Sequence, residues 1–149
     1  MRIFNYIFAT GLGAGFSPVA PGTAGSILAV LIIYFIPPIS PWLLILSLFI
    51  LFWVGVYTGG QLEKELGEDP SQVVIDEIVG MGISLLFLPL DWRLLLIAFI
   101  LFRLFDIWKP FPVKLAEKMH GGLGIMLDDV IAGIYALIGV HLLRWLFFI

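Results

Sequence analysis

The sequence predicts an all-α protein, a small polytopic membrane bundle of about five membrane helices with an N-terminal interfacial or re-entrant segment. Of its 149 residues, 61% are hydrophobic and only 13% are charged, whereas about a quarter of the residues in soluble domains carry a charge. The mean hydropathy is +1.10, and the apolar runs are separated by short proline-rich or polar breaks. The length predicts a single domain over residues 1–149.

The first element is the apolar stretch Ile3–Ala9, which follows a single basic residue, Arg2. A signal peptide would carry a stronger basic region and a clear small-x-small cleavage site, and neither is evident. We therefore expect an interfacial or re-entrant helix here.

Five further apolar segments are expected to cross the membrane, with a polar loop or short surface helix over residues 61–72. The breaks Pro37–Pro41 and Pro89–Asp91 then share one side, so the polar motifs meet on the other. The first crossing is short, about 20 Å of helix against about 30 Å of hydrocarbon, which tilt or local thinning can accommodate. The expected crossings cover residues 24–36, 42–60, 73–88, 92–108 and 130–148.

The distribution of lysine and arginine predicts the orientation. The motif side holds six of these residues and the far side two, Arg93 and Arg144. The positive-inside rule therefore places the motifs at the cytoplasmic face. The six residues of the motif side are Arg2, Lys64, Arg103, Lys109, Lys114 and Lys118.

Two pairs of adjacent carboxylates stand against apolar runs: Asp76 with Glu77, and Asp128 with Asp129. A charge near lipid costs a few kcal/mol or more, so such residues usually face a cation, a basic partner or a wet cavity. A simpler interpretation is that Asp128 and Asp129 cap the final helix in the headgroup layer. The recurrence of the arrangement favours a site.

Basic residues and a turn-rich loop supply groups that can bind an anion. Arg103, Asp106 and Lys109 are spaced by three residues and share one helical face. At the head of the first crossing, backbone N–H groups and hydroxyls are typical of an anion site at a helix N-terminus, although an N-cap with a proline turn explains that loop equally well. The loop residues concerned are Pro21, Gly22, Thr23 and Ser26.

The chemistry of these groups points to a magnesium site. There are no cysteines and only two histidines, and hard oxygen ligands favour Mg²⁺. Arg103 and Lys109 can hold phosphate oxygens while the metal polarises the phosphoryl group and acidifies an attacking water. This predicts phosphoryl chemistry on a phosphorylated lipid headgroup. The candidate ligands are Asp76, Glu77, Asp106, Asp128 and Asp129, of which the last three are also candidate catalytic residues.

The identity of the nucleophile stays open between a metal-activated water and an aspartyl-phosphate, and so does the number of ions. Our working hypothesis is direct attack by water. A loop histidine, His120, is a candidate donor of a proton to the leaving oxygen.

Other classes of protein fit less well. With net charge −3 and no basic run, nothing indicates nucleic-acid binding, and no obligatory protein partner is inferred. An ion-coupled transporter also carries intramembrane carboxylates, but here they gather at one face. A structural protein with charged helix caps leaves the shared face of Arg103, Asp106 and Lys109 unexplained.

Four motifs, in order along nearly the whole chain, closely resemble the phosphatidylglycerophosphatase A family. The resemblance implies a bacterial inner-membrane, Mg²⁺-dependent phosphatase of phospholipid biosynthesis that converts phosphatidylglycerophosphate to phosphatidylglycerol. No motif covers the residues before Gly11. The motifs are Pro-Val-Ala-Pro-Gly-Thr-Ala-Gly-Ser at 18–26, Asp-Glu-Ile-Val-Gly-Met at 76–81, Phe-Arg-Leu-Phe-Asp-Ile-Trp-Lys-Pro-Phe-Pro at 102–112 and Gly-Gly-Leu-Gly-Ile-Met-Leu-Asp-Asp-Val-Ile-Ala-Gly at 121–133.

Overall fold

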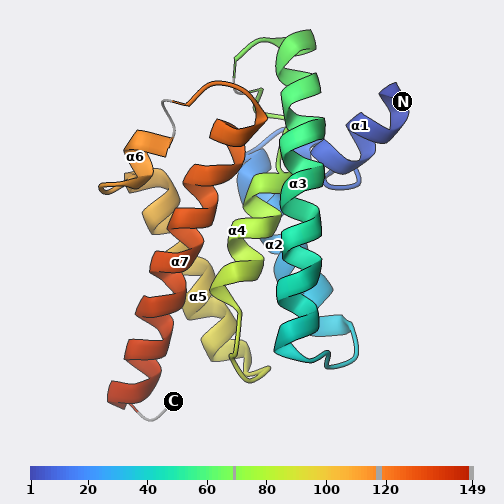
Figure 1. Cartoon of the computed structure of the whole chain (residues 1–149). Coiled ribbons are helices and arrows are strands. Elements are labelled where there is room, and N and C mark those ends of the chain that lie inside the picture. Colours follow the sequence, from blue (N-terminus) through green and yellow to red (C-terminus); the bar gives the residue numbers. More distant parts are fainter. Residues whose placement is uncertain (69, 117–118, 148–149) are drawn as a thin grey trace.

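The computed structural model describes residues 1–68, 70–116 and 119–147, and within these ranges all regular structure is helical. Figure 1 shows the helices as a bundle with the two long ones, α3 and α7, on either side of a short one, α4. The all-α class predicted from the sequence is confirmed. The elements are α1 (Arg2–Ala9), a 3-10 helix η1 (Ala14–Phe16), α2 (Pro21–Phe35), α3 (Pro41–Leu66), α4 (Ile75–Ser84), α5 (Trp92–Trp108), α6 (Val113–Ala116) and α7 (Gly122–Phe147).

Helix α4 is the centre of the bundle, since it packs against α2, α3, α5 and α7. Its inner face carries Met81, which is fully buried in a cluster with Phe102 of α5 and Ala132 of α7. The cluster buries apolar side chains of α2, α5 and α7 around α4. The position of α4 therefore decides how the ends of its neighbours are arranged.

Two helices, α3 and α7, are long and apolar enough to cross a membrane, with 26 residues each. The expected helix over 73–88 is too long: α4 has 10 residues, a rise of about 15 Å against about 30 Å of hydrocarbon. It ends at Ser84 because the chain turns, with Phe87 at φ 61°. Five full-length crossings are therefore not seen, whereas the expected crossing 92–108 coincides with α5.

Two further boundaries differ from those expected. The first half of the polar segment 61–72 forms neither a loop nor a separate surface helix, because α3 continues to Leu66 and buries Leu62 completely. Residue 69 lies outside the described residues. Helix α7 begins at Gly122, eight residues before the expected crossing. Its early start places Asp128 and Asp129 almost two turns inside a helix, so they do not cap it.

The N-terminal segment forms a helix, α1, that packs against α3. Glu65 of α3 accepts hydrogen bonds from Arg2 Nε at 3.2 Å and Tyr6 Oη at 3.3 Å. The Glu65 carboxylate, with the Tyr6 hydroxyl, raises the pKa of the Arg2 guanidinium. The opposite face leaves Ile3 exposed. Helix α1 thus has exposed apolar side chains and an ion pair to the bundle. This arrangement is compatible with an interfacial helix, and the interfacial position stays a prediction.

Candidate metal and phosphate site

A close crossing of α4 and α7 fixes the centre of the site. A Cβ on Gly80 would lie 2.5 Å from the Asp129 carbonyl oxygen, and one on Gly133 would collide with the Gly80 carbonyl. The two backbones touch because neither glycine has a side chain. Gly80 is four residues after Asp76, and Gly133 is four after Asp129. The contact one turn along each helix therefore brings these two carboxylates together.

Three carboxylates meet above this crossing. One oxygen from each of Asp76, Glu77 and Asp129 lies within 4.8 Å of the others. Asp76 and Asp129 are buried, at 9% and 2% exposure. Two oxygens that each lie about 2.1 Å from one Mg²⁺ are at most about 4.2 Å apart, so three oxygens this close can take up a single ion with little movement.

The pair on α4 occupies the first turn of its helix, which begins at Ile75, two residues after the start of the expected crossing over 73–88. The helix starts late because the Val74 amide donates to the Ala9 carbonyl at 2.8 Å and so belongs to the preceding loop. A carboxylate in the first turn is stabilised by the positive end of the helix dipole. This partly offsets the cost of burying Asp76 and Glu77.

Arg103 of α5 links three helices at the edge of the cluster. Its Nη1 lies 2.7 Å from Asp106 Oδ2 and 4.0 Å from Glu77 Oε1, and it makes a long hydrogen bond of 3.5 Å to Ser26 Oγ on α2. Within the described part of the chain its buried Nε has no hydrogen-bond partner. Arg103 therefore retains an unused N–H donor at the edge of the cluster.

Lys109, which ends α5 with a left-handed backbone at φ 48°, binds the other acidic pair. Its Nζ lies 2.8 Å from Asp128 Oδ2, and Asp128 Oδ1 accepts a hydrogen bond from the Asp129 amide at 3.0 Å. Both oxygens of Asp128 are therefore engaged. Asp106 and Asp128, predicted as ligands, each bind a basic side chain here, and their role toward a metal stays a prediction.

The charges of the cluster do not balance. Five carboxyl groups face Arg103 and Lys109, which leaves three carboxylates without a compensating charge among the described residues. Buried oxygens that lack a hydrogen-bond partner in the same part of the chain are Asp76 Oδ1, Glu77 Oε2 and Asp129 Oδ2. Unpaired buried carboxylates are costly. The residues present therefore fit a divalent cation.

The predicted anion loop lies at the start of α2. Pro21 is the first residue of the helix, and its N-cap, Ala20, provides no side-chain cap, so the first-turn amides of Gly22 and Thr23 have no partner within the helix. A Cβ on Gly22 would collide with Glu77 Oε1. Ser26 is buried and donates to the Gly22 carbonyl at 2.9 Å. The loop thus adjoins the carboxylates, with its open amides beside Arg103.

The last motif and the link before it contribute one exposed candidate residue and two tightly packed glycines. His120 is exposed in the link before α7 and, among the described residues, makes no hydrogen bond or ion pair, so its catalytic role stays a prediction. Of the glycines before Asp128, two serve packing, because added Cβ atoms would collide with the Val56 carbonyl at Gly122 and the Met119 carbonyl at Gly124.

Sequence reasoning missed the structural roles of Gly80 and Gly133. A signal for both was present, because each follows an acidic residue by four positions in its motif. One helical turn separates such residues, so a glycine there can bring a helix close to its neighbour just beneath the acid.

Comparison with known proteins identifies the family. The family model described as phosphatidylglycerophosphatase A matches residues 7–144. The chain belongs to the phosphatidylglycerophosphatase A family. It is therefore an enzyme of the phosphatase class, and the carboxylate cluster lies on two of the motifs that carry the resemblance.

Relatives match over most of their length. A Bacteroides thetaiotaomicron protein named provisionally as a phosphatidylinositol-3-phosphatase is 46% identical, covering 93% of this chain and 92% of that protein. The phosphatidylglycerophosphatase A proteins of Escherichia coli and Haemophilus influenzae are each 40% identical, covering 87% and 94% of this chain and 77% and 88% of those proteins. No solved structure matches the chain.

Proposed function

We propose that this protein removes the terminal phosphate from phosphatidylglycerophosphate to give phosphatidylglycerol, with Mg²⁺, at the cytoplasmic face of the bacterial inner membrane. The observation that carries the proposal is the group of three converging carboxylates with unpartnered buried oxygens beside Arg103. The names of the two phosphatidylglycerophosphatase A relatives support this substrate.

Asp76, Glu77 and Asp129 would hold the cation, since their oxygens converge. When bound, Mg²⁺ supplies positive charge to the phosphoryl oxygens and makes a nearby water more acidic. Asp128 keeps Lys109 at the edge of the site through the 2.8 Å ion pair. The ion pair thus keeps the positive charge of Lys109 close to the reacting phosphate, although Lys109 does not bind the metal.

Arg103 and the first turn of α2 would bind the phosphate. The guanidinium offers Nε, which has no partner in the described part of the chain, and charge-assisted hydrogen bonds to phosphate are strong. The open amides of Gly22 and Thr23 point from a helix N-terminus, which favours an anion. Water attacks phosphorus, the bond to the glycerol oxygen breaks, and that oxygen takes a proton as it leaves.

A membrane location is supported by the sides of the bundle. Large apolar side chains are exposed on several helices, among them Phe35 on α2, Trp42 on α3 and Ile107 on α5. Such surfaces mark contact with lipid or a partner. Figure 1 shows the turns between α2 and α3 and between α4 and α5 at one end of the bundle, away from the site. Arg93 lies at that far end, and Lys118 lies outside the described residues.

A second substrate has one observation in its favour. The 46% identical relative carries the name of a phosphatase acting on phosphatidylinositol 3-phosphate. That lipid and phosphatidylglycerophosphate share a phosphate monoester and two acyl chains and differ in the alcohol that leaves. Both therefore belong in the first assay.

The test is phosphate release by detergent-solubilised protein given either lipid, with Mg²⁺ or with a chelator. We expect Mg²⁺-dependent release from phosphatidylglycerophosphate at a higher kcat/KM than from phosphatidylinositol 3-phosphate, and little release by Asp129→Asn. A preference for the inositol lipid would reassign the substrate. Release that persists in chelator would overturn the metal, and no release from either lipid by well-folded protein would overturn the proposal.

A further inference from the structure

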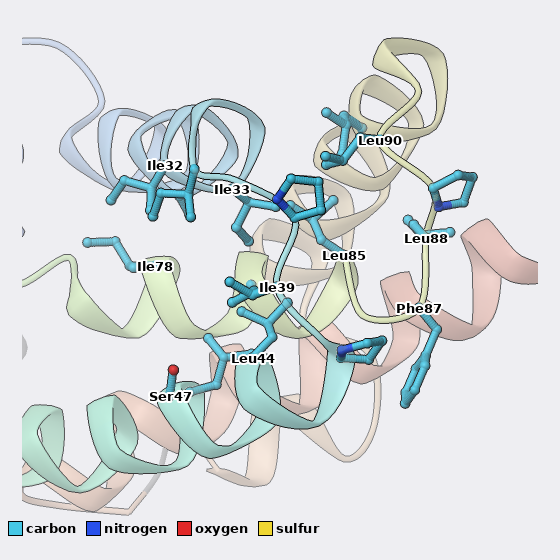
Figure 2. A pocket seen from close by; sticks show the side chains of 18 of the residues that line it. Ile32, Ile33, Ile39, Leu44, Ser47, Ile78, Leu85, Phe87, Leu88 and Leu90 are labelled. Atoms are coloured by element: carbon cyan, nitrogen blue, oxygen red, sulfur yellow. The ribbon is translucent and has the colours of Figure 1, made fainter.

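Two apolar hollows flank α2 below the charged cluster. The larger, about 760 Å³, lies between α2 and α3 with α4 beneath it, and Figure 2 shows Ile32 and Ile33 of α2 and Ile78 of α4 around it. The smaller, about 410 Å³, is a groove between α2 and α5 that Leu31 of α2 and Leu96 of α5 line. Both fall in the size range of ligand pockets.

The larger hollow meets tightly packed side chains around Ile78. Ile78 is the first α4 residue that lines it. A Cβ on Gly11 would lie 2.6 Å from Ile78 Cδ1, 3.1 Å from Val74 Cγ2 and 3.6 Å from Leu28 Cδ2. The segment after α1 thus packs tightly over Ile78. A ligand in this hollow would meet close-packed side chains at Ile78.

The smaller groove leads to the site. Its lining residue Ile27 directly follows Ser26, and its lining residue Phe99 precedes Arg103 by one helical turn. The hydrogen bond from Arg103 to Ser26 joins α5 to α2 at this end of the groove. One end of the groove therefore lies next to the residues that would bind a phosphate.

We propose that the α2–α5 groove seats an acyl chain of the phospholipid substrate while Arg103 and the first turn of α2 hold its phosphate. The inference rests on the proposed function. A phospholipid is anionic at one end and apolar along its chains, and the site matches both: a guanidinium and open amides at the head, then a groove whose lining residues carry no charge.

The groove acts on orientation more than on affinity. A chain that leaves the bilayer for an apolar groove exchanges one apolar surrounding for another, so its transfer free energy changes little. What the groove provides is a fixed direction for the chain, which sets the phosphate against the carboxylates. Productive alignment of this kind is expressed in kcat/KM.

Adjacent residues of α2 provide a matched pair of variants. Leu31 lines the groove and is 46% exposed, and Ile32 lines the larger hollow and is 38% exposed. Leu31→Trp fills the groove, and Ile32→Trp fills the larger hollow with the same side chain. Neither residue touches the charged cluster, so both variants retain the site.

Each variant is assayed on long-chain phosphatidylglycerophosphate and on its deacylated headgroup, glycerophosphoglycerophosphate. We expect Leu31→Trp to lower kcat/KM for the lipid about tenfold and to leave the headgroup reaction unchanged, with Ile32→Trp like wild type on both. The proposal is overturned if Leu31→Trp hydrolyses the lipid normally, if it loses both reactions equally, or if Ile32→Trp shows the selective loss.

A second readout does not depend on hydrolysis. A phosphatidylglycerophosphate analogue with a diazirine in one acyl chain is photolysed with the protein, and adducts are mapped by mass spectrometry. We expect adducts at Ile27, Leu31 and Leu96, which line the groove and not the larger hollow. Unlabelled phosphatidylglycerophosphate should compete these adducts away, and phosphatidylcholine should not. Adducts at the larger hollow, or adducts that no lipid competes away, would overturn the proposal that the groove binds an acyl chain. This readout works whether or not the protein releases phosphate. A lack of phosphate release would count against the proposed function instead.

Discussion

The acidic pairs of α4 and α7 look alike in sequence and differ in structure. Asp76 and Glu77 occupy the first turn of a 10-residue helix, whereas Asp128 and Asp129 lie almost two turns inside a helix of 26 residues. In each pair one member faces a basic residue: Glu77 lies 4.0 Å from Arg103, and Asp128 lies 2.8 Å from Lys109.

The other member of each pair, Asp76 or Asp129, is buried and has an oxygen without a partner among the described residues. Adjacent positions on a helix point about 100° apart. One residue of a pair can therefore face a basic side chain while its neighbour faces the centre of the carboxylate cluster. The comparison teaches a division of roles. Asp76 and Asp129 provide uncompensated charge, and Asp128 is paired with Lys109. Glu77 shares both roles, because its Oε1 lies near Arg103 and its Oε2 has no partner among the described residues.

The largest effect is expected when the uncompensated members are neutralised. Asp76→Asn and Asp129→Asn should each lower phosphate release about a thousandfold, because several kcal/mol of charge stabilisation are lost. Without divalent cation, each variant should unfold at or above the wild-type temperature, since a buried unpaired carboxylate has been removed. Activity assays and thermal unfolding in chelator test both statements.

The same two variants should lose the response of stability to metal. Mg²⁺ raises the unfolding temperature of a protein that binds it only when folded, so wild type should gain stability and Asp129→Asn should gain little. An equal rise in unfolding temperature in both proteins would show that Asp129 does not bind the ion. Asp128 and Asp129 would then not differ in their role toward the metal.

The next effect comes from separating the two pairs. In Gly80→Ala the new methyl group would lie 2.5 Å from the Asp129 carbonyl and 2.7 Å from the Phe102 ring, so α4 and α7 must move apart. We expect phosphate release to fall about a hundredfold, as a displacement of about 1 Å at a reacting centre can cause. The measurement is kcat/KM with the Mg²⁺-induced shift in unfolding temperature.

Gly139→Ala on α7 is the matched control. Its Cβ would meet only the end of the flexible Leu101 side chain at 3.1 Å, and alanine favours a helix over glycine by about 1 kcal/mol. We expect wild-type activity from this control. Full activity in Gly80→Ala would show that the glycine crossing does not set the distance between the pairs.

A smaller effect is expected for the member that binds lysine. Asp128→Asn or Lys109→Gln should each lower kcat about 10- to 100-fold, the range for groups that position others, and should preserve the metal-induced stabilisation. Because both side chains act through one ion pair, the double variant should lose little more than either single variant. Loss of the metal response in Asp128→Asn would make the two members of that pair equivalent.

The smallest effect is expected at His120, which belongs to neither pair and is exposed. A general acid contributes about 10²- to 10⁴-fold to a rate. We expect His120→Ala to change kcat less than about threefold across the working pH range. A loss of a hundredfold would restore this histidine as the proton donor.

The gathering of the motifs at one end could be predicted, because it follows from the order of apolar runs and breaks. The bounds of α5 were equally accessible: Asp91 caps the helix, its side chain accepting from the Arg93 amide at 2.8 Å, and Pro110 follows its end. Local chemistry decides such boundaries.

The start of α7 and the length of α4 were not accessible, because tertiary neighbours decide them. Glycines at 121–124 are typical of a loop, yet Gly122 and Gly124 pack within a helix against carbonyls of other segments. Helix α4 loses its expected first residues because the Val74 amide pairs with Ala9. The division of roles within each acidic pair likewise depends on which neighbouring helix supplies a cation.

The depth of Asp129 has a consequence for how a reaction ends. Seven residues of α7, about 10 Å of helix, precede Asp129, and α3 continues beyond Gly60, whose added Cβ would lie 3.2 Å from the Gly122 nitrogen. The carboxylates thus lie below a rim formed by two helix ends. On the proposed function, inorganic phosphate departs past this rim into water, and the dephosphorylated lipid returns sideways to the bilayer between α2 and α5. The two products leave by separate exits, so neither has to wait for the other.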